Sequence, residues 1–219
     1  MSLFLARDAE TLLVDNILLA NLTSDHLSPM SVEQAKRNFL QTYNPHRNQN
    51  IALSLAIKVS VQRNPTYSEQ APLGPVRKQI RSFWRDRLIQ YAQNDETFDG
   101  PEGFTASILN LKNQMNEQFL GYFNENFRIS HAQKSLSVYL KHLWCMGEGA
   151  EPPLCPVDGV ILNYASMGQP RISWTQIDQI DEYQAAIAVL RNKCTADNQY
   201  NDPPLRLAEW ELVHFNGQP

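Results

Sequence analysis

The chain has 219 residues, of which 42% are hydrophobic and 19% are charged, and its formal net charge is −4. This composition is typical of a globular domain, and no segment approaches the ~18 uninterrupted apolar residues of a membrane span. The acidic balance argues against indiscriminate binding to nucleic acid or to an anionic membrane. The apolar run over 11–22 is broken by Asp15 and follows no cationic region, so we expect no signal peptide and a cytoplasmic location.

Apolar residues at helical spacing predict about eight or nine helices. In chain order the helical segments are 9–22, 32–43, 51–62, 75–93, 104–123, 131–146, 159–164, 174–190 and 205–215. The segment over 51–62 also alternates in part like a strand, and its length and alanine content favour a helix. No alternating run is bounded by hairpin turns, so we predict an all-α fold in one compact domain over 1–219, with the proline-rich loop over 64–75 as the candidate sub-boundary.

Capping signals predict where several of these helices begin. Ser31, Ser130 and Ser173 are each followed three residues later by Gln, which is the spacing of a capping box. Pro75 suits the first turn of a helix, and Asp158 is a natural N-cap. The helix after Ser130 is amphipathic, so we expect one buried face and one polar face turned to solvent or to a ligand. The polar face carries Lys134, Ser137 and Lys141.

Basic residues gather in one predicted helix. Arg77, Arg81 and Arg85 form a row at four-residue spacing, and Arg87 lies close to it in sequence. Such a row, with Trp84 available for stacking, would suit the phosphates of a nucleic acid. The alternative is an ordinary solvated flank of a helix whose aromatic residues belong to the core.

Lys134 and Asp158 carry a resemblance to a known family. Lys134 stands in HAQKSLSVYL, and the pair Val157-Asp158 stands in CPVDGVIL. The arrangement over 127–165 resembles the helix-hairpin-helix DNA glycosylases, in which a lysine near the start of a helix is followed, after that helix and a loop, by a Val-Asp that begins the next helix. The family's glycine-bearing hairpin is replaced here by NFRISHA, and the interval from lysine to aspartate is longer.

The resemblance implies a DNA partner and a specific chemistry. Lys134 would attack the anomeric carbon of the sugar as a Schiff-base nucleophile, and Asp158 would activate the amine or stabilise positive charge. The target base would have to leave the stack. A relative that has lost catalysis would keep the fold and the DNA partner. The residues alone leave another interpretation open, in which Lys134 is a solvated helical residue and Asp158 only caps a helix.

The cysteines give no sign of a metal site. Cys145, Cys155 and Cys194 are odd in number and no export signal accompanies them, so we expect reduced thiols. His142 and Cys145 make only half of a zinc-binding pattern, so we predict buried structural thiols, no metal and no cofactor. Cys155, in a proline-flanked loop, is an alternative nucleophile for which the sequence names no base.

Function stays open between different classes. One hypothesis is a DNA-associated helical protein with Lys134 and Asp158 at its site and the arginine row on the DNA backbone. The rival is a non-enzymatic helical module that binds another protein or itself, and neither hypothesis involves a membrane. A groove shared by Lys134 and the arginine row would favour the first, whereas a position on separate faces would contradict it. A large exposed apolar patch would favour the second, and a deep pocket with polar groups of perturbed pKa would indicate a small-molecule enzyme.

Overall fold

The computed structural model describes residues 30–62, 65–93, 100–166 and 172–216. Contacts between Cα atoms divide the chain into two units, Met1–Ser31 and Val32–Pro219, and the architecture below is that of the second unit. The candidate sub-boundary over 64–75 falls within the second unit. The helix predicted over 9–22 lies outside the described residues. Among the described residues, no helix is both long enough and apolar enough to cross a membrane.

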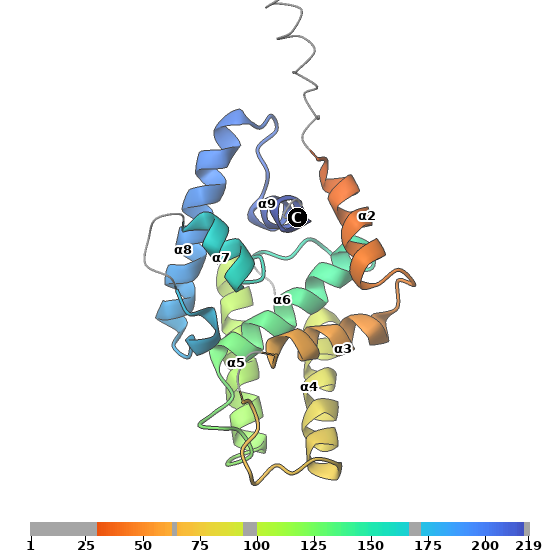
Figure 1. Ribbon diagram of the computed structural model, residues 1–219, viewed down its shortest axis with the longest axis vertical. Helices are drawn as coiled ribbons and strands as arrows, with labels where there is room; N and C mark the ends of the chain where they lie inside the picture. Colours follow the sequence, from red (N-terminus) through yellow and green to blue (C-terminus); the bar gives the residue numbers. More distant parts are fainter. Residues whose placement is uncertain (1–29, 63–64, 94–99, 167–171, 217–219) are drawn as a thin grey trace, which may run out of the picture. The chain divides into compact units, whose positions relative to one another are not determined.

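The described part of the chain is built from eight α-helices and two short 3-10 helices (Figure 1). In chain order they are α2 (Val32–Tyr43), α3 (Gln49–Ser60), α4 (Pro75–Gln93), α5 (Gly100–Gln118), α6 (Ile129–Met146), α7 (Gly159–Ala165), η2 (Trp174–Gln176), α8 (Ile180–Asp197), η3 (Asn198–Tyr200) and α9 (Leu207–Asn216). The described ranges contain no β-strand, and the predicted all-α class is confirmed. The ambiguous segment over 51–62 lies mostly in α3, so the choice of a helix there is confirmed too.

Helix α6 is the centre of this unit, and the other helices pack around it (Figure 1). It contacts α2, α3, α4, α5, α8 and η2. Every residue of α6 except Val138 is buried, although the helix contains two lysines, two histidines and several other polar residues. A helix buried on all sides is usually apolar all round. The polar residues of α6 therefore need partners inside the protein.

The expectation that one face of this helix meets solvent is wrong in part. Lys134, Ser137 and Lys141 are all buried, because α7 and α9 supply a further layer of structure on that side (Figure 1). Lys134 does line a cavity, as described below, so the ligand alternative remains open for that residue. Gly147 ends the helix as expected, in a left-handed conformation with φ of 78°.

Two of the predicted capping boxes are wrong. Helix α6 begins at Ile129 rather than at His131, and the backbone N–H of Arg128 donates to Nδ1 of His131 at 3.1 Å. The hydroxyl of Ser130 is drawn away to the carbonyl of Thr175, at 3.2 Å. Likewise Ser173 precedes only the short helix η2, and the long helix α8 begins after Gln179.

The helix boundary predicted from proline agrees with the structure better than those predicted from the capping boxes of Ser130 and Ser173. Helix α4 runs from Pro75 to Gln93, as predicted. Helix α5 begins at Gly100, earlier than the predicted 104, and ends at Gln118 rather than at 123. Its early end follows from Gly121, whose φ of 82° cannot continue a right-handed helix.

A buried ion pair fastens α9 to α6. Nζ of Lys141 donates to both carboxylate oxygens of Glu211, at 3.0 and 2.7 Å. The same ammonium lies 4.8 Å from the ring centroid of Phe39 on α2 and 4.4 Å from that of Phe215 on α9. Burial raises the pKa of Glu211, and the charge of Lys141 opposes that rise. One cation from the central helix thus joins α2 and α9, the first and last described helices.

Removing this cation should destabilise the fold strongly. Lys141→Met leaves the Glu211 carboxylate buried without its partner, so we expect the free energy of unfolding to fall by about 3–5 kcal/mol. The double variant Lys141→Met/Glu211→Leu should recover most of that loss, because a well-packed apolar pair can replace a buried ion pair. Urea unfolding followed by circular dichroism measures both quantities.

A matched control for this prediction lies on the surface. Glu33, whose side chain is 69% exposed, forms a salt bridge with Lys36 at 2.8 Å. Glu33→Gln should change the free energy of unfolding little, since exposed ion pairs contribute little. A Lys141→Met protein as stable as the Glu33→Gln protein would contradict the role given to the buried pair.

Candidate functional site

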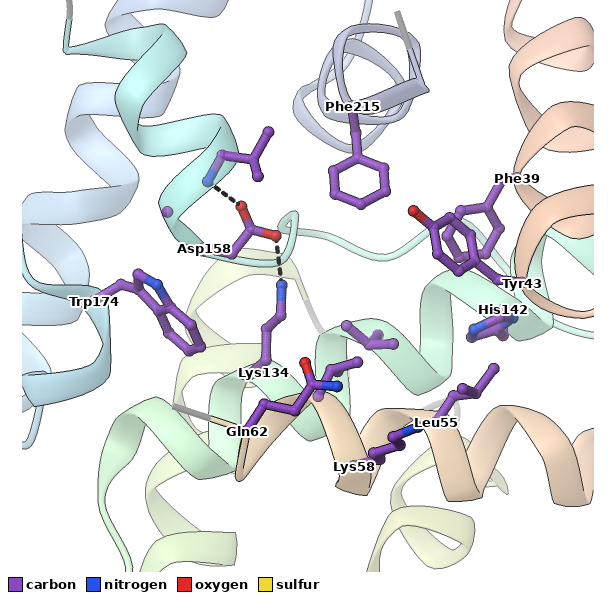
Figure 2. Close-up of a pocket in the computed structure, with 14 residues that line it drawn as sticks. Phe39, Tyr43, Leu55, Lys58, Gln62, Lys134, His142, Asp158, Trp174 and Phe215 are labelled. Atoms are coloured by element: carbon purple, nitrogen blue, oxygen red, sulfur yellow. Dashed lines mark hydrogen bonds and ion pairs between the residues drawn. The ribbon is translucent and has the colours of Figure 1, made fainter. Parts of the chain in front are cut away.

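A cavity of about 350 Å³ opens beside the polar side of α6 (Figure 2). Its volume falls within the range of about 300–1,000 Å³ that small-molecule sites occupy. Its lining is mostly aromatic and aliphatic, with a few polar side chains from α3, α6 and the start of α7. The lining residues are Phe39, Tyr43, Leu55, Lys58, Val59, Gln62, Lys134, Val138, His142, Asp158, Gly159, Val160, Trp174 and Phe215.

Lys134 and Asp158 meet in this cavity. Nζ of Lys134 donates to Oδ2 of Asp158 at 2.6 Å, and the two residues are only 7% and 8% exposed. The other carboxylate oxygen accepts from the backbone N–H groups of Val160 at 2.9 Å and Ile161 at 3.0 Å, so Asp158 is the predicted N-cap of α7. Figure 2 shows the lysine reaching upward to the carboxylate, between Trp174 and the other aromatic residues.

Backbone contacts fix the two residues relative to each other. The side-chain amide of Gln133, next to Lys134, donates to the carbonyl of Val157 at 2.9 Å and accepts from the N–H of the same residue at 3.1 Å. Val157 immediately precedes Asp158. The residue before the lysine is therefore bonded twice to the residue before the aspartate. This clamp holds the start of α7 against α6 and limits the freedom of the ion pair.

Burial and the charge of Lys134 have opposite effects on the pKa of Asp158. Burial alone would raise the pKa of Asp158, but the charge of Lys134, its hydrogen bond and the N–H of Ile161 outweigh burial and lower that pKa. The aspartate is therefore a carboxylate near neutral pH and a proton acceptor within hydrogen-bond distance of an amine. The alternative in which Lys134 is simply solvated is wrong, because the residue is more than nine-tenths buried.

The arginine row does not share this cavity. Arg77, Arg81 and Arg85 line a different depression, with Leu73, Gly74, Lys78 and Ser82, and it has no lining residue in common with the Lys134 cavity. Arg87 lines neither of the two, and its guanidinium lies 4.9 Å from the ring centroid of Phe83. The two groups of predicted residues are therefore not brought together in one groove.

Contacts within the protein already engage part of the row. Arg77 donates to the carbonyl of Ala71 at 2.7 Å, and Arg85 donates to Asn50 and Ser54 of α3 at 2.9 and 3.2 Å. Helix α3 also supplies the exposed Lys58 to the Lys134 cavity. This helix therefore lies between the arginine depression and the cavity, and it carries a cation on the cavity side.

His142 is a cavity residue that the sequence suggested only as half of a zinc-binding pattern. It is 1% exposed, and burial together with the charge of Lys141 lowers its pKa to about 4. Its ring is therefore neutral near neutral pH. The aromatic walls were not predicted either, because Phe39, Trp174 and Phe215 are far apart in sequence and each resembles an ordinary core residue.

The cysteines do not form a reactive centre. All three are buried and free, and no group of three His, Cys, Asp or Glu residues within the described ranges is placed to hold a metal ion. Burial raises the pKa of the Cys155 thiol well above its usual range, and burial likewise raises that of Cys145 to about 12. A protonated thiol is a poor nucleophile, so the alternative that assigned catalysis to Cys155 loses its basis.

Two substitutions at Asp158 should separate its charge from its capping role. Asp158→Asn keeps an N-cap but leaves Lys134 without its carboxylate, so it should lower the free energy of unfolding near neutral pH. Asp158→Ala removes the cap as well and should cost about 1 kcal/mol more. Urea unfolding of the wild-type protein and of the two variants measures the differences in the free energy of unfolding.

The pH dependence of that difference tests the ion pair directly. Since the pKa of Asp158 is lowered in the folded protein, the pair stabilises it above the unfolded value of about 3.9, and the contribution is lost as pH falls through the folded pKa. The difference in the free energy of unfolding between the wild-type protein and Asp158→Asn should therefore become smaller at acid pH. A difference that stays constant from neutral to acid pH would rule out a stabilising charge at position 158.

Comparisons with known proteins add no relative to this picture. The chain matches no protein-family model, no curated protein and no solved structure. The resemblance to the helix-hairpin-helix glycosylases therefore depends on the residues of this chain alone. The function has to be argued from the chemistry of the Lys134 cavity.

Proposed function

We propose that the protein acts on DNA as a glycosylase that uses Lys134 as its nucleophile, with Asp158 as the proton acceptor. One observation carries the proposal: a buried amine and a carboxylate lie 2.6 Å apart in a cavity with aromatic walls. A lysine must lose its proton to attack, and a neighbouring base within hydrogen-bond reach is the usual means of activation. In the described part of the chain, no comparable group of residues supports the alternative, a helical module that binds another protein.

The proposed reaction replaces the bond between C1′ and the base by an imine between C1′ and Lys134. The amine nitrogen of Lys134 bonds to C1′ of the deoxyribose, and the bond from C1′ to the base breaks with its electron pair leaving on the base. The proton of the amine passes to Asp158 and from there to the departing base. The sugar ring then opens at O4′, which takes up a second proton from the attacking nitrogen through Asp158, and a protonated imine joins Lys134 to C1′. Asp158 also stabilises the positive charge that develops at C1′.

The cavity suits a base that has left the helix. Aromatic rings of Phe39, Tyr43 and Phe215 lie at one end of it and Trp174 lies at the other, with Lys134 between them (Figure 2). Tyr43 is 41% exposed, so it offers a stacking surface at the cavity mouth. Stacking on aromatic side chains stabilises an extruded base by about 1–3 kcal/mol. These rings would replace part of the stacking lost when the base leaves the duplex.

Borohydride trapping on DNA tests the nucleophile. We expect the protein to form a covalent complex with a duplex that contains an abasic site when borohydride is present, because the hydride reduces the imine to a stable amine. Lys134→Gln should abolish the complex, since its amide can still donate to Asp158 but cannot form an imine. Denaturing gel electrophoresis measures the yield.

A control variant distinguishes chemistry from folding. Lys141→Met/Glu211→Leu removes the other buried lysine of α6 without leaving a buried unpaired carboxylate, so this protein should still be trapped. Binding to the duplex without trapping would identify an inactive relative that keeps the DNA partner. Absence of binding even at low salt would exclude a DNA function and favour a helical module that binds another protein or a second copy of this chain.

We further propose that Arg77, Arg81 and Arg85 contact the DNA backbone. They lie across α3 from the Lys134 cavity. Each phosphate contact contributes about −0.9 to the slope of log affinity against log salt, so Arg81→Gln should make that slope less steep by about this amount. Arg191→Gln on α8 is the matched control and should leave the slope unchanged, because Arg191 lines a different depression. Fluorescence anisotropy over a salt series measures the slopes, and equal slopes for the two variants would remove the arginine row from the interface.

A further inference from the structure

Helix α3 contacts both of the places where the proposed function puts DNA. In its first two turns Asn50 and Ser54 accept hydrogen bonds from Arg85, which lines the arginine depression. In its last turn Lys58 lines the Lys134 cavity. The depression and the cavity have no lining residue in common, so α3 bridges two sites that are otherwise separate.

One side of α3 is polar and exposed over most of the helix. Asn50, Ser54 and Lys58 follow one another at four-residue spacing, which places them on neighbouring turns of one side, and all three are exposed. From Asn50 to Lys58 this side extends about 12 Å along the helix axis. One strand of a DNA duplex carries a phosphate about every 3.4 Å of duplex axis, so a strand along α3 would bring several phosphates past these residues. Residues 49–60 include no Asp or Glu that would repel them.

The two cations that line the Lys134 cavity differ in their partners. Lys134 is paired with Asp158, and both residues are buried. Lys58 is exposed, and its ammonium forms no ion pair or hydrogen bond with another residue of the described ranges. Figure 2 shows Lys58 below Lys134, whereas Asp158 lies above it. Since the charges of Lys134 and Asp158 cancel, Lys58 gives the edge of the cavity a net positive charge, which attracts an anion.

The other sides of the cavity, as far as the structure describes them, supply no free cation. Residues 126–132, which lead into α6, are all buried or half-buried, and the guanidinium of Arg128 bonds with Glu125. The lysines and histidines of α6 are buried, and α7 contains no basic residue. The residues of α2 and α9 that line the cavity are aromatic. A phosphate at the edge of the cavity would therefore bind to α3.

We infer that the DNA strand with the reacting nucleotide follows the exposed polar side of α3, and that Lys58 is a positioning residue that binds a phosphate flanking the reacting sugar. This inference rests on the proposed function, because it takes the sugar to lie at Lys134. Arg85 binds a phosphate farther along the same strand. A phosphate fixed beside the sugar limits how the sugar can turn, so Lys58 orients C1′ toward the amine of Lys134.

Neutralising single phosphates tests this path. The full chain is titrated with abasic duplexes in which one phosphate flanking the abasic site is replaced by an uncharged methylphosphonate, and fluorescence anisotropy measures binding. Lys134→Gln is present in every protein, so that no imine forms and the titration reports binding alone. We expect one of the two flanking replacements to weaken binding about fivefold, since an exposed ion pair is lost. When Lys58→Gln is added, the same replacement should weaken binding no further.

Matched variants show that the effect belongs to the charge of Lys58. Lys58→Arg keeps the charge and should respond to the methylphosphonates as the parent chain does. Arg191→Gln on α8 removes an exposed charge far from α3 in sequence and should leave the response unchanged, because Arg191 lines a different depression. Circular dichroism confirms that each variant is folded.

The rate of trapping tests the positioning role. With Lys134 intact and the abasic duplex at saturating concentration, borohydride trapping of Lys58→Gln should be about tenfold slower than that of the unaltered protein, because the sugar is less well oriented. Lys58→Arg should restore the rate. A residue that served binding alone would leave the rate at saturation unchanged.

The outcomes separate the two proposals. If the unaltered protein traps abasic DNA but neither flanking methylphosphonate distinguishes Lys58→Gln from its parent, the place given to Lys58 is wrong and the proposed function stands. An unchanged rate of trapping at saturation likewise overturns the positioning role alone. Absence of trapping by the unaltered protein overturns the proposed function and this inference with it.

Discussion

The fold depends on burying a polar helix. Helix α6 has almost no exposed surface, yet it carries the ammonium groups of Lys134 and Lys141 into the interior. Burying an unpaired charge costs far more free energy than a domain of this size can spare, so each lysine requires a carboxylate from elsewhere. Asp158, at the start of α7, forms a salt bridge with Lys134, and Glu211 on α9 forms one with Lys141. The C-terminal third of the chain is thereby fixed on α6 by charge as well as by apolar contact.

The two pairs also act on each other. Lys141 helps to lower the pKa of Asp158, and Asp158 helps to raise that of Glu211. The interior thus holds a cluster of two cations and two anions, in which the titrations of the two carboxyl groups are linked. The proposed nucleophile and its acceptor belong to this cluster. The chemistry of the cavity and the stability of the C-terminal layer consequently share the same groups.

Local signals explain which features the sequence predicted. Asp158 was identified because an aspartate before a helical segment is a strong N-cap, and α4 was bounded well because Pro75 fixes its first turn. Ser130 and Ser173 carry the same type of local signal, and it failed because Ser130 bonds across to Thr175 and because the chain at Ser173 forms only a 3-10 turn. Local spacing cannot reveal a competing partner from another segment.

The cavity itself could be predicted only in part. Lys134 and Asp158 were paired through a family pattern, but their burial and the aromatic walls depend on tertiary packing. His142 illustrates the limit, since no local pattern predicts its ring contact with Phe39, 103 positions before it, or its place in the cavity wall. The arginine row does lie on one helix, α4, yet α3 separates it from the lysine it was expected to accompany.

The position of Glu211 in the chain has a consequence for synthesis. It lies 70 residues after Lys141, in the last described helix. A ribosome that has completed α6 has made a helix whose second lysine still has no carboxylate to meet, and that lysine must remain in water until α9 emerges. Helix α6 therefore cannot reach its final burial before α9 has been made. The nascent protein must keep its central helix partly open, and this part of the core can close only after α9 has left the ribosome.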